Sequence, residues 1–258
     1  MKRSLLPRAA VPAAAAVAIA LVGASARAAV IIWQTPTAES TASDVSTTGT
    51  LVSAFALGNT GSSDVSVNSV SFVPSGQVSY HTSLTLPGTT DTISATPSGA
   101  DLSNNGGNSP GLSGSYNTLL SNRVYNSNST SALVLTLNSL TVGHNYLFQT
   151  WVNDSRPGVN ALKLTVADGN GNSAILAANT NGTAGTPGQY VIGTFTADAT
   201  GSQVIDYKYY SGSYSETLAN AFQLRDLGSV ITPEPATLGL LGLGGLGLLL
   251  LGKRRKTA

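Results

Sequence analysis

The sequence predicts an all-β fold, an antiparallel β-sandwich of the jelly-roll type, between two terminal segments of different character. From residue 30 onward, short apolar runs are separated by Gly, Asn, Ser and Pro, without a sustained 3.6-residue period. Several runs alternate apolar and polar residues, as Leu133, Leu135 and Leu137 do. Such alternation is typical of antiparallel strands with one buried and one wet face. We expect a signal peptide helix in residues 1–28, the β-sandwich domain in 29–230, and a transmembrane helix within a sorting segment, 231–258.

The individual elements follow from the same pattern. Between two of the alternating runs, Asp168-Gly-Asn-Gly-Asn predicts a tight hairpin connection. A short helix is expected over 116–125, where Leu119, Leu120 and Val124 recur. The polar stretch 75–115 predicts either long loops or poorly paired edge strands. The expected strands are 30–33, 50–57, 67–73, 132–140, 145–153, 160–167, 173–178, 190–196, 203–210 and 218–227.

Charge separates the three parts of the chain. The 258 residues hold 13 Lys and Arg against 12 Asp and Glu, but eight of the basic residues lie in the two terminal segments. Residues 29–230 keep five basic against eleven acidic residues, a net charge of −6. That sign argues against a nucleic-acid partner, since phosphate binding needs clustered Lys and Arg. The chain has no Cys, which excludes disulfides, Cys-ligated metals and a Cys nucleophile.

The first segment has the features of a secretory signal peptide. Lys2, Arg3 and Arg8 form a basic region before the apolar run 13–22, and small residues follow it. Cleavage is expected after Ala26 or Ala28. The alternative is an uncleaved anchor helix, for which the apolar run is short.

The last segment has three parts in a fixed order. Pro233, Glu234 and Pro235 precede the apolar stretch 236–251, which would form a helix of about 24 Å and cross the membrane only marginally. Four basic residues then follow, which the positive-inside rule leaves in the cytoplasm. They are Lys253, Arg254, Arg255 and Lys256.

This order resembles the PEP-CTERM sorting signal of Gram-negative bacteria. The resemblance implies that exosortase, a membrane protease or transpeptidase, cuts near Pro-Glu-Pro. It also implies transient residence in the inner membrane with the domain outside, then the cell surface or the extracellular space, with extracellular polysaccharide as an associated partner. Thr232 stands where the family often has Val. The alternative is an ordinary tail anchor.

A second resemblance covers the later part of the domain. The segments Leu-Thr-Val-Gly-His-Asn-Tyr-Leu-Phe-Gln-Thr-Trp at 140–151 and Asn-Ala-Phe-Gln-Leu-Arg at 220–225 are similar to strands of galactose-binding-like jelly rolls. Many carbohydrate-binding modules have that fold. The resemblance implies a fold and does not establish a ligand.

The densest polar group follows an aromatic residue at the end of one expected strand. An aromatic ring can stack on a sugar while Asp and Arg bind its hydroxyls, which makes this group the candidate ligand-binding site. The alternative, which we favour, is that Trp151 is part of the core and that Asp154 and Arg156 form a structural ion pair. The candidate residues are Trp151, Asn153, Asp154 and Arg156.

The sequence predicts no catalytic residue, metal site or cofactor. Asp168, Asn170 and Asn172 have the spacing of a calcium loop, but the positions where that loop needs Gly and Glu hold Ser and Asn, so a hairpin turn explains them. A structural calcium ion elsewhere in the fold stays open. His81 and His144 are expected on surface loops.

We therefore expect an exported, non-enzymatic matrix component or weak carbohydrate-binding module. One alternative is a secreted polysaccharide hydrolase in which the fold brings together acids such as Asp154, Asp206 or Glu216. The other is a structural surface or adhesin subunit without a small ligand.

Overall fold

A computed structural model describes residues 29–76, 79–96, 102–105, 110–156, 159, 161–212 and 214–229. The signal peptide expected in 1–28 and the sorting segment expected in 231–258 lie outside these residues. Within the described ranges, no helix is long and apolar enough to cross a membrane.

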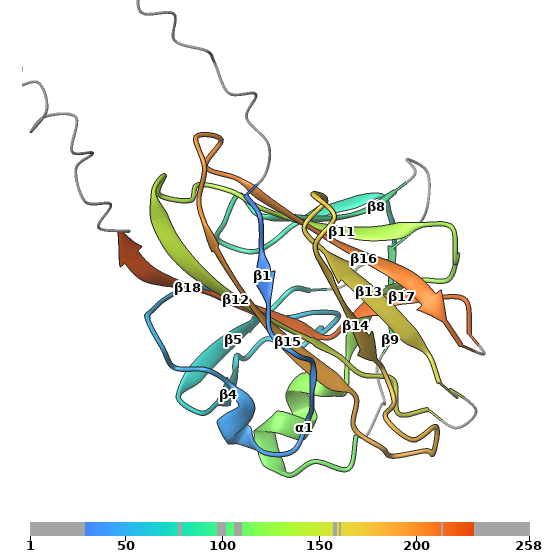
Figure 1. Cartoon of the computed structure of the whole chain (residues 1–258). Coiled ribbons are helices and arrows are strands. Elements are labelled where there is room, and N and C mark those ends of the chain that lie inside the picture. Colours follow the sequence, from blue (N-terminus) through green and yellow to red (C-terminus); the bar gives the residue numbers. More distant parts are fainter. Residues whose placement is uncertain are drawn as a thin grey trace, which may run out of the picture.

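The first of two large sheets has eight strands and runs through the middle of the molecule (Figure 1). Its order is β1-β15-β12-β18-β3-β5-β4, with β2 also paired to β15. The pairs are antiparallel except β3 with β5. The strands are β1 (Ile32–Trp33), β2 (Thr37–Ala38), β3 (Thr50–Ala56), β4 (Val65–Val67), β5 (Val70–Pro74), β12 (His144–Val152), β15 (Gln189–Thr196) and β18 (Ala221–Ser229).

The second large sheet has six strands in the order β14-β13-β16-β11-β8-β7, all antiparallel. They are β7 (Ser83–Thr85), β8 (Thr92–Thr96), β11 (Ala132–Leu137), β13 (Lys163–Ala167), β14 (Ser173–Ala177) and β16 (Gln203–Ser211). A small sheet, β17-β10-β9-β6, contains β6 (Ser79–His81), β9 (Leu102–Asn105), β10 (Arg123–Asn126) and β17 (Thr217–Ala219). The remaining elements are η1 (Ala42–Asp44) and α1 (Gly114–Leu120).

The main hydrophobic core lies between the two large sheets. Phe148 and Leu224 enter it from the eight-stranded sheet, and Leu135 and Ile205 enter it from the six-stranded sheet. The alternation read from the sequence explains this core, because every second residue of β11 and β13 is buried. The expected all-β sandwich is confirmed.

A second core covers part of the other face of the eight-stranded sheet. Trp151 of β12 packs there with Phe72 of β5, and with Tyr116 and Leu119 of α1. The end of β12 is therefore enclosed on both faces, although a sandwich strand normally keeps one face wet.

Two expected strands are divided. The run 67–73 becomes β4 and β5, because Asn68 and Ser69 both have positive φ (47° and 64°) and form a tight hairpin turn. The run 218–227 becomes β17 and β18, which belong to different sheets and are separated by Asn220. In both places the apolar pattern continues across the break, so hydrophobicity alone gives no boundary.

The expected helix 116–125 is wrong at its carboxyl end. The helix spans Gly114–Leu120, and Arg123 begins strand β10, which pairs with β9 and β17. The polar stretch 75–115 contains short strands, of which β6 and β7 are sheet edges and β8 lies between β7 and β11. Of the two alternatives for this stretch, strands are the better description.

Candidate functional site

Trp151 lies inside the protein. It is fully buried, its ring centroid is 5.7 Å from that of Phe72, and its Nε1 donates a 3.0 Å hydrogen bond to the Tyr116 hydroxyl. Stacking on a sugar needs an open aromatic face. The interpretation of Trp151 as a ligand-stacking residue is therefore wrong, because α1 and β5 cover the ring.

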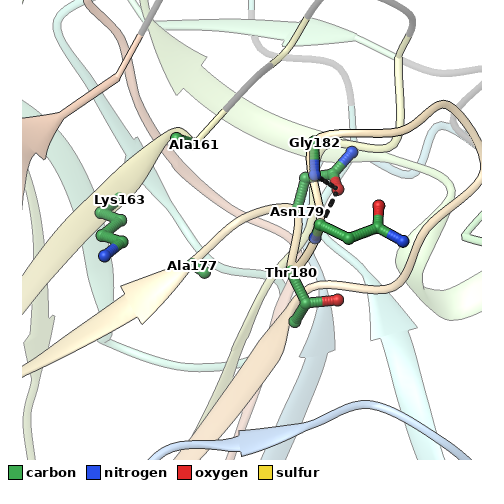
Figure 2. Close-up of a pocket in the computed structure, with 7 residues that line it drawn as sticks. Ala161, Lys163, Ala177, Asn179, Thr180 and Gly182 are labelled. Atoms are coloured by element: carbon green, nitrogen blue, oxygen red, sulfur yellow. Dashed lines mark hydrogen bonds between the residues drawn. The ribbon is translucent and has the colours of Figure 1, made fainter.

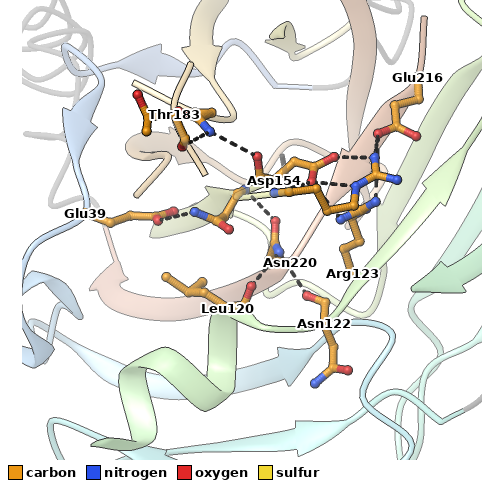
Figure 3. Close-up of polar contacts among 11 residues, drawn as sticks. Glu39, Leu120, Asn122, Arg123, Asp154, Thr183, Glu216 and Asn220 are labelled. Atoms are coloured by element: carbon orange, nitrogen blue, oxygen red, sulfur yellow. Dashed lines mark hydrogen bonds and ion pairs between the residues drawn. The ribbon is translucent and has the colours of Figure 1, made fainter. Parts of the chain in front are cut away.

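Asn153 and Asn220 connect the end of β12 to distant parts of the chain (Figure 3). The Asn153 backbone N–H donates to Asn220 Oδ1 at 2.6 Å, and Asn153 Nδ2 donates to Glu39 Oε2 at 3.2 Å. Asn220 Nδ2 donates to the backbone carbonyls of Leu120 and Asn122. All of these contacts lie inside the protein. Together, Asn153 and Asn220 join the end of β12 to Glu39 and to the end of α1.

Four charged side chains meet beside this network, and we call Arg123, Asp154, Arg156 and Glu216 the four-charge cluster (Figure 3). Arg156 binds Asp154 in a bidentate pair, with Nε–Oδ1 2.8 Å and Nη2–Oδ2 2.5 Å. The same Nη2 donates to Glu216 Oε1. Arg123 forms a further ion pair with Asp154, in which Nη1 lies 3.1 Å from Oδ1. Its Nη2 lies 3.8 Å from Glu216 Oε1.

The fold explains how these residues meet. Asp154 and Arg156 follow β12, while the pairing of β10 with β17 brings Arg123 near Glu216, which precedes β17. Arg123 and Asp154 are fully buried and Glu216 is nearly so, whereas the Arg156 side chain is 30% exposed. Arg156 also lies over the Tyr214 ring, 5.3 Å from its centroid. Two positive and two negative groups balance, which burial of charge requires.

The ionisation of the cluster follows from its geometry. Burial opposes ionisation of Asp154, but Arg156 and Arg123 outweigh burial and hold its pKa below the ordinary value. Burial and then the adjacent Asp154 carboxyl raise the pKa of Glu216, against both guanidinium groups. Burial also lowers the pKa of Arg123. The two carboxyls therefore differ in acidity although they share the same two guanidinium groups.

Two carboxyls with separated pKa values are also a feature of glycosidase sites. Here the Arg156 guanidinium bonds to both Asp154 and Glu216, and Asp154 is fully buried. Asp206, the third acid considered, is on β16 and pairs with Lys208 at 3.1 Å. In the four-charge cluster, each acid is paired with an arginine.

Asp168, Asn170 and Asn172 form a hairpin turn between β13 and β14. Asp168 Oδ1 accepts from the backbone N–H of Asn170 (2.7 Å) and of Asn172 (3.2 Å), and Oδ2 accepts from Asn172 Nδ2 (3.0 Å). Oδ2 also accepts from Ile31 N at 2.9 Å, which fixes the start of β1. Within the residues described, no three His, Cys, Asp or Glu side chains are placed to hold a metal ion.

The two histidines lie in different strands. His144 begins β12, is half-buried, and its Nδ1 lies 2.8 Å from Asp226 Oδ2. His81 ends β6, and its side chain is outside what the structure describes. His144 is therefore part of a strand and an ion pair, where a surface loop was expected.

A hollow of about 530 Å³ opens beside the end of β14 (Figure 2). Asn179 is largely committed to its own loop, donating to Thr183 O and accepting from Gly182 N. Lys163 is exposed at the hollow and has no ion-pair partner among the described residues. The lining residues are Ala161, Lys163, Ala177, Asn179, Thr180, Asn181 and Gly182.

Sequence reasoning missed Arg123, Glu39 and Asn220. Arg123 and Glu216 lie 31 residues before and 62 residues after Asp154, so no local spacing connects them. One signal was available: the domain has only five basic residues, and a buried acid such as Asp154 needs one of them.

Comparisons with known proteins give one specific match. The model of the PEP-CTERM protein-sorting motif matches residues 232–256, a range that includes Pro233, Glu234, Pro235 and the basic residues 253–256. No curated protein matches the chain.

Some solved structures show weak likeness. Two crystal structures of an exo-beta-1,3-galactanase from Phanerochaete chrysosporium, each with beta-1,3-galactotriose, are 14% identical and have TM-scores of 0.31 and 0.29. Each match covers 62% of this chain and 32% of the galactanase chain, so this chain spans about a third of the length of the galactanase. A third structure is that of a carbohydrate-binding module of the β-sandwich superfamily, which is 11% identical and has a TM-score of 0.16. This match covers 55% of this chain and 66% of the chain of the module. At such TM-scores these likenesses carry no argument about ligand or activity.

The match to residues 232–256 implies export through exosortase, with transient membrane anchoring by the C-terminal region. The chain carries a PEP-CTERM protein-sorting motif at residues 232–256.

Proposed function

We propose that the protein is a non-enzymatic structural component of the cell surface or extracellular matrix, released from the membrane after processing near Pro233, Glu234 and Pro235. Export by the sorting motif supports the location. The observation that carries the non-enzymatic part is the Arg156 guanidinium, which bonds to both Asp154 and Glu216. A domain with few charges and many hydroxyl and amide groups suits a place among neutral polysaccharides.

The test is incubation of the full chain with the extracellular polysaccharide of the producing cell, with new reducing ends as the readout. We expect no release above the level of buffer for the natural chain and for Glu216→Gln. The matched control is Asp64→Asn, which changes an exposed acid that bonds to Ser71. Release that occurs in the natural chain and in Asp64→Asn but disappears in Glu216→Gln would establish the hydrolase alternative instead.

Weak glycan binding is a second candidate function, and the hollow at Lys163 is the observation that favours it (Figure 2). The Asn181 side-chain amide and the Lys163 ammonium group, which has no ion-pair partner among the described residues, offer hydrogen-bond donors to sugar hydroxyls or to a uronate, and the Thr180 hydroxyl, which donates to Pro187 O, can accept. The same incubation measures this function by cosedimentation with the polysaccharide. Binding that is lost in Lys163→Gln supports it, and binding unchanged in Lys163→Gln would place any glycan contact elsewhere.

A further inference from the structure

Three exposed apolar side chains gather at one end of the eight-stranded sheet. Val30 is 56% exposed, Ile32 is 72% exposed and Leu227 is 39% exposed, and all three line one hollow of about 360 Å³. We call these three residues the tether-side apolar patch. The rest of the hollow is formed by Asn145, Thr194, Phe195 and Thr196.

The patch departs from the alternation that holds elsewhere in the fold. Ile31 is buried and Trp33 packs against the core, so residues 30 and 32 face outward. An outward position on a sandwich strand is normally polar, yet these two are Val and Ile. Grouped apolar side chains that face water mark interaction sites.

The patch lies where both ends of the domain emerge. Strands β1 and β12 are both antiparallel to β15, so β1 begins at the end of the sheet where β12 begins. His144, at the start of β12, pairs with Ser229, at the end of β18. Val30 and Ser229 are therefore at the same end of the sheet, as the strand directions in Figure 1 also show.

The sorting motif keeps this end close to the bilayer. The matched residues begin at 232, and the apolar stretch begins at 236, seven positions after the last residue of β18. Seven steps of extended chain reach at most about 25 Å. While the chain is anchored, the patch therefore stays within a short distance of the lipid headgroups, and a short tether gives an effective concentration on the order of millimolar.

The charges near the patch do not supply attraction to lipid. Asp226 pairs with His144, and the Arg225 guanidinium donates to the backbone carbonyls of Thr47, Thr48 and Gly49. Binding to a membrane at this end of the sheet would therefore be driven by burial of the apolar side chains of the patch. Val, Ile and Leu side chains gain free energy when they leave water for the boundary between headgroups and acyl chains.

We propose that the tether-side apolar patch docks the domain on the outer surface of the membrane that anchors it. The docked domain would hold Pro233, Glu234 and Pro235 at the bilayer surface, where a membrane enzyme can reach them. Once the tail is cut, the tether no longer concentrates the patch at the lipid, and the domain leaves. This inference rests on the transient anchoring that the motif implies and is independent of what the released protein does.

A single introduced cysteine can report docking, because the chain has none. The full chain is reconstituted in phosphatidylcholine vesicles that carry a quencher on the upper acyl chain, with a fluorophore on Thr196→Cys at the hollow. The matched reporter is Ala184→Cys, an exposed position in the loop that bonds to Ser155 at the other end of β12, about 30 Å away. We expect strong quenching at 196 and little at 184.

The deciding variant is Val30→Thr with Ile32→Thr, which keeps β-branched side chains in the strand and removes apolar surface. We expect the ratio of docked to undocked chains to fall by about tenfold or more. Ile175→Thr on β14, an exposed isoleucine outside the patch, should leave quenching at 196 unchanged. Equal quenching at 196 and 184, or quenching that survives the double variant, would overturn the proposal. Energy transfer between labelled copies, without lipid quenching, would overturn it in favour of a second copy as the occupant.

Discussion

Glu39 is a carboxyl group held in the interior, with no ion-pair partner among the residues that the structure describes. Its Oε2 accepts from Gly188 N at 2.9 Å and from Asn153 Nδ2, while Oε1 is buried without a hydrogen-bond partner. Burial raises the pKa of Glu39 from 4.5 to about 8, against these two hydrogen bonds. At neutral pH the group is therefore mostly protonated, which reduces the cost of its burial.

This pKa predicts how stability depends on pH. Between pH 4.5 and about 8 the folded state keeps a proton on Glu39 that the unfolded state loses. The contribution of Glu39 to the free energy of unfolding should therefore be greatest below pH 4.5 and should fall as pH rises, by at most about 1.4 kcal/mol per pH unit. Glu39→Gln should remove that part of the slope, measured by denaturant unfolding from pH 5 to 8.

Asp64→Asn is the control for this measurement, because it changes an acid on the surface. It should leave the slope as in the natural chain. If Glu39→Gln and the natural chain lose stability equally as pH rises, Glu39 does not hold the proton.

At the scale of elements, the β13–β14 hairpin fixes the first strand of the domain. Asp168 ties its own turn together and also accepts from Ile31 N, and Trp33 Nε1 donates to Asn172 O at 3.3 Å. Strand β1 has only two paired residues on β15, so these contacts from the hairpin are a large part of what holds it.

Asp168→Asn should loosen β1 selectively. An amide can keep one accepting oxygen for Asn170 N, but its NH₂ group then faces the Ile31 N–H, donor against donor. We expect a loss of about 1–3 kcal/mol in unfolding free energy and faster hydrogen exchange at Ile31. Asp198→Asn is the matched control, because Asp198 accepts from Thr200 N in a similar turn without reaching another strand. Unchanged exchange at Ile31 in Asp168→Asn would show that β1 is held by other contacts.

The elements also show what can be predicted from the sequence. Strands such as β11 and β13 could be located because alternation marks one buried face, and the hairpin at Asp168 because its residues favour turns. The break at Asn220 and the strand at Arg123 depend on partners far along the chain. Arg156 could be paired with Asp154 because the two lie only two positions apart, whereas Arg123 and Glu216 meet Asp154 only through the pairing of β10 with β17.

The whole molecule has two unlike ends. Val30, His144 and Ser229 lie at one end of the eight-stranded sheet, and the four-charge cluster follows the other end of β12. Nine strand residues separate them, about 30 Å. During anchoring, the end with the apolar patch faces the membrane and the end with the cluster and the Lys163 hollow faces away.

Release of the protein from the membrane depends, in the proposed function, on processing at the sorting motif. The most direct test is fractionation of cells that produce the full chain with Glu234→Gln, which keeps the size of the side chain and removes its charge. The control is Ile231→Val, just outside the matched range. We predict that Glu234→Gln stays in the inner membrane at its unprocessed mass, while the natural chain and Ile231→Val are released in shortened form. Release of Glu234→Gln with the same mass and yield as the natural chain would contradict the account.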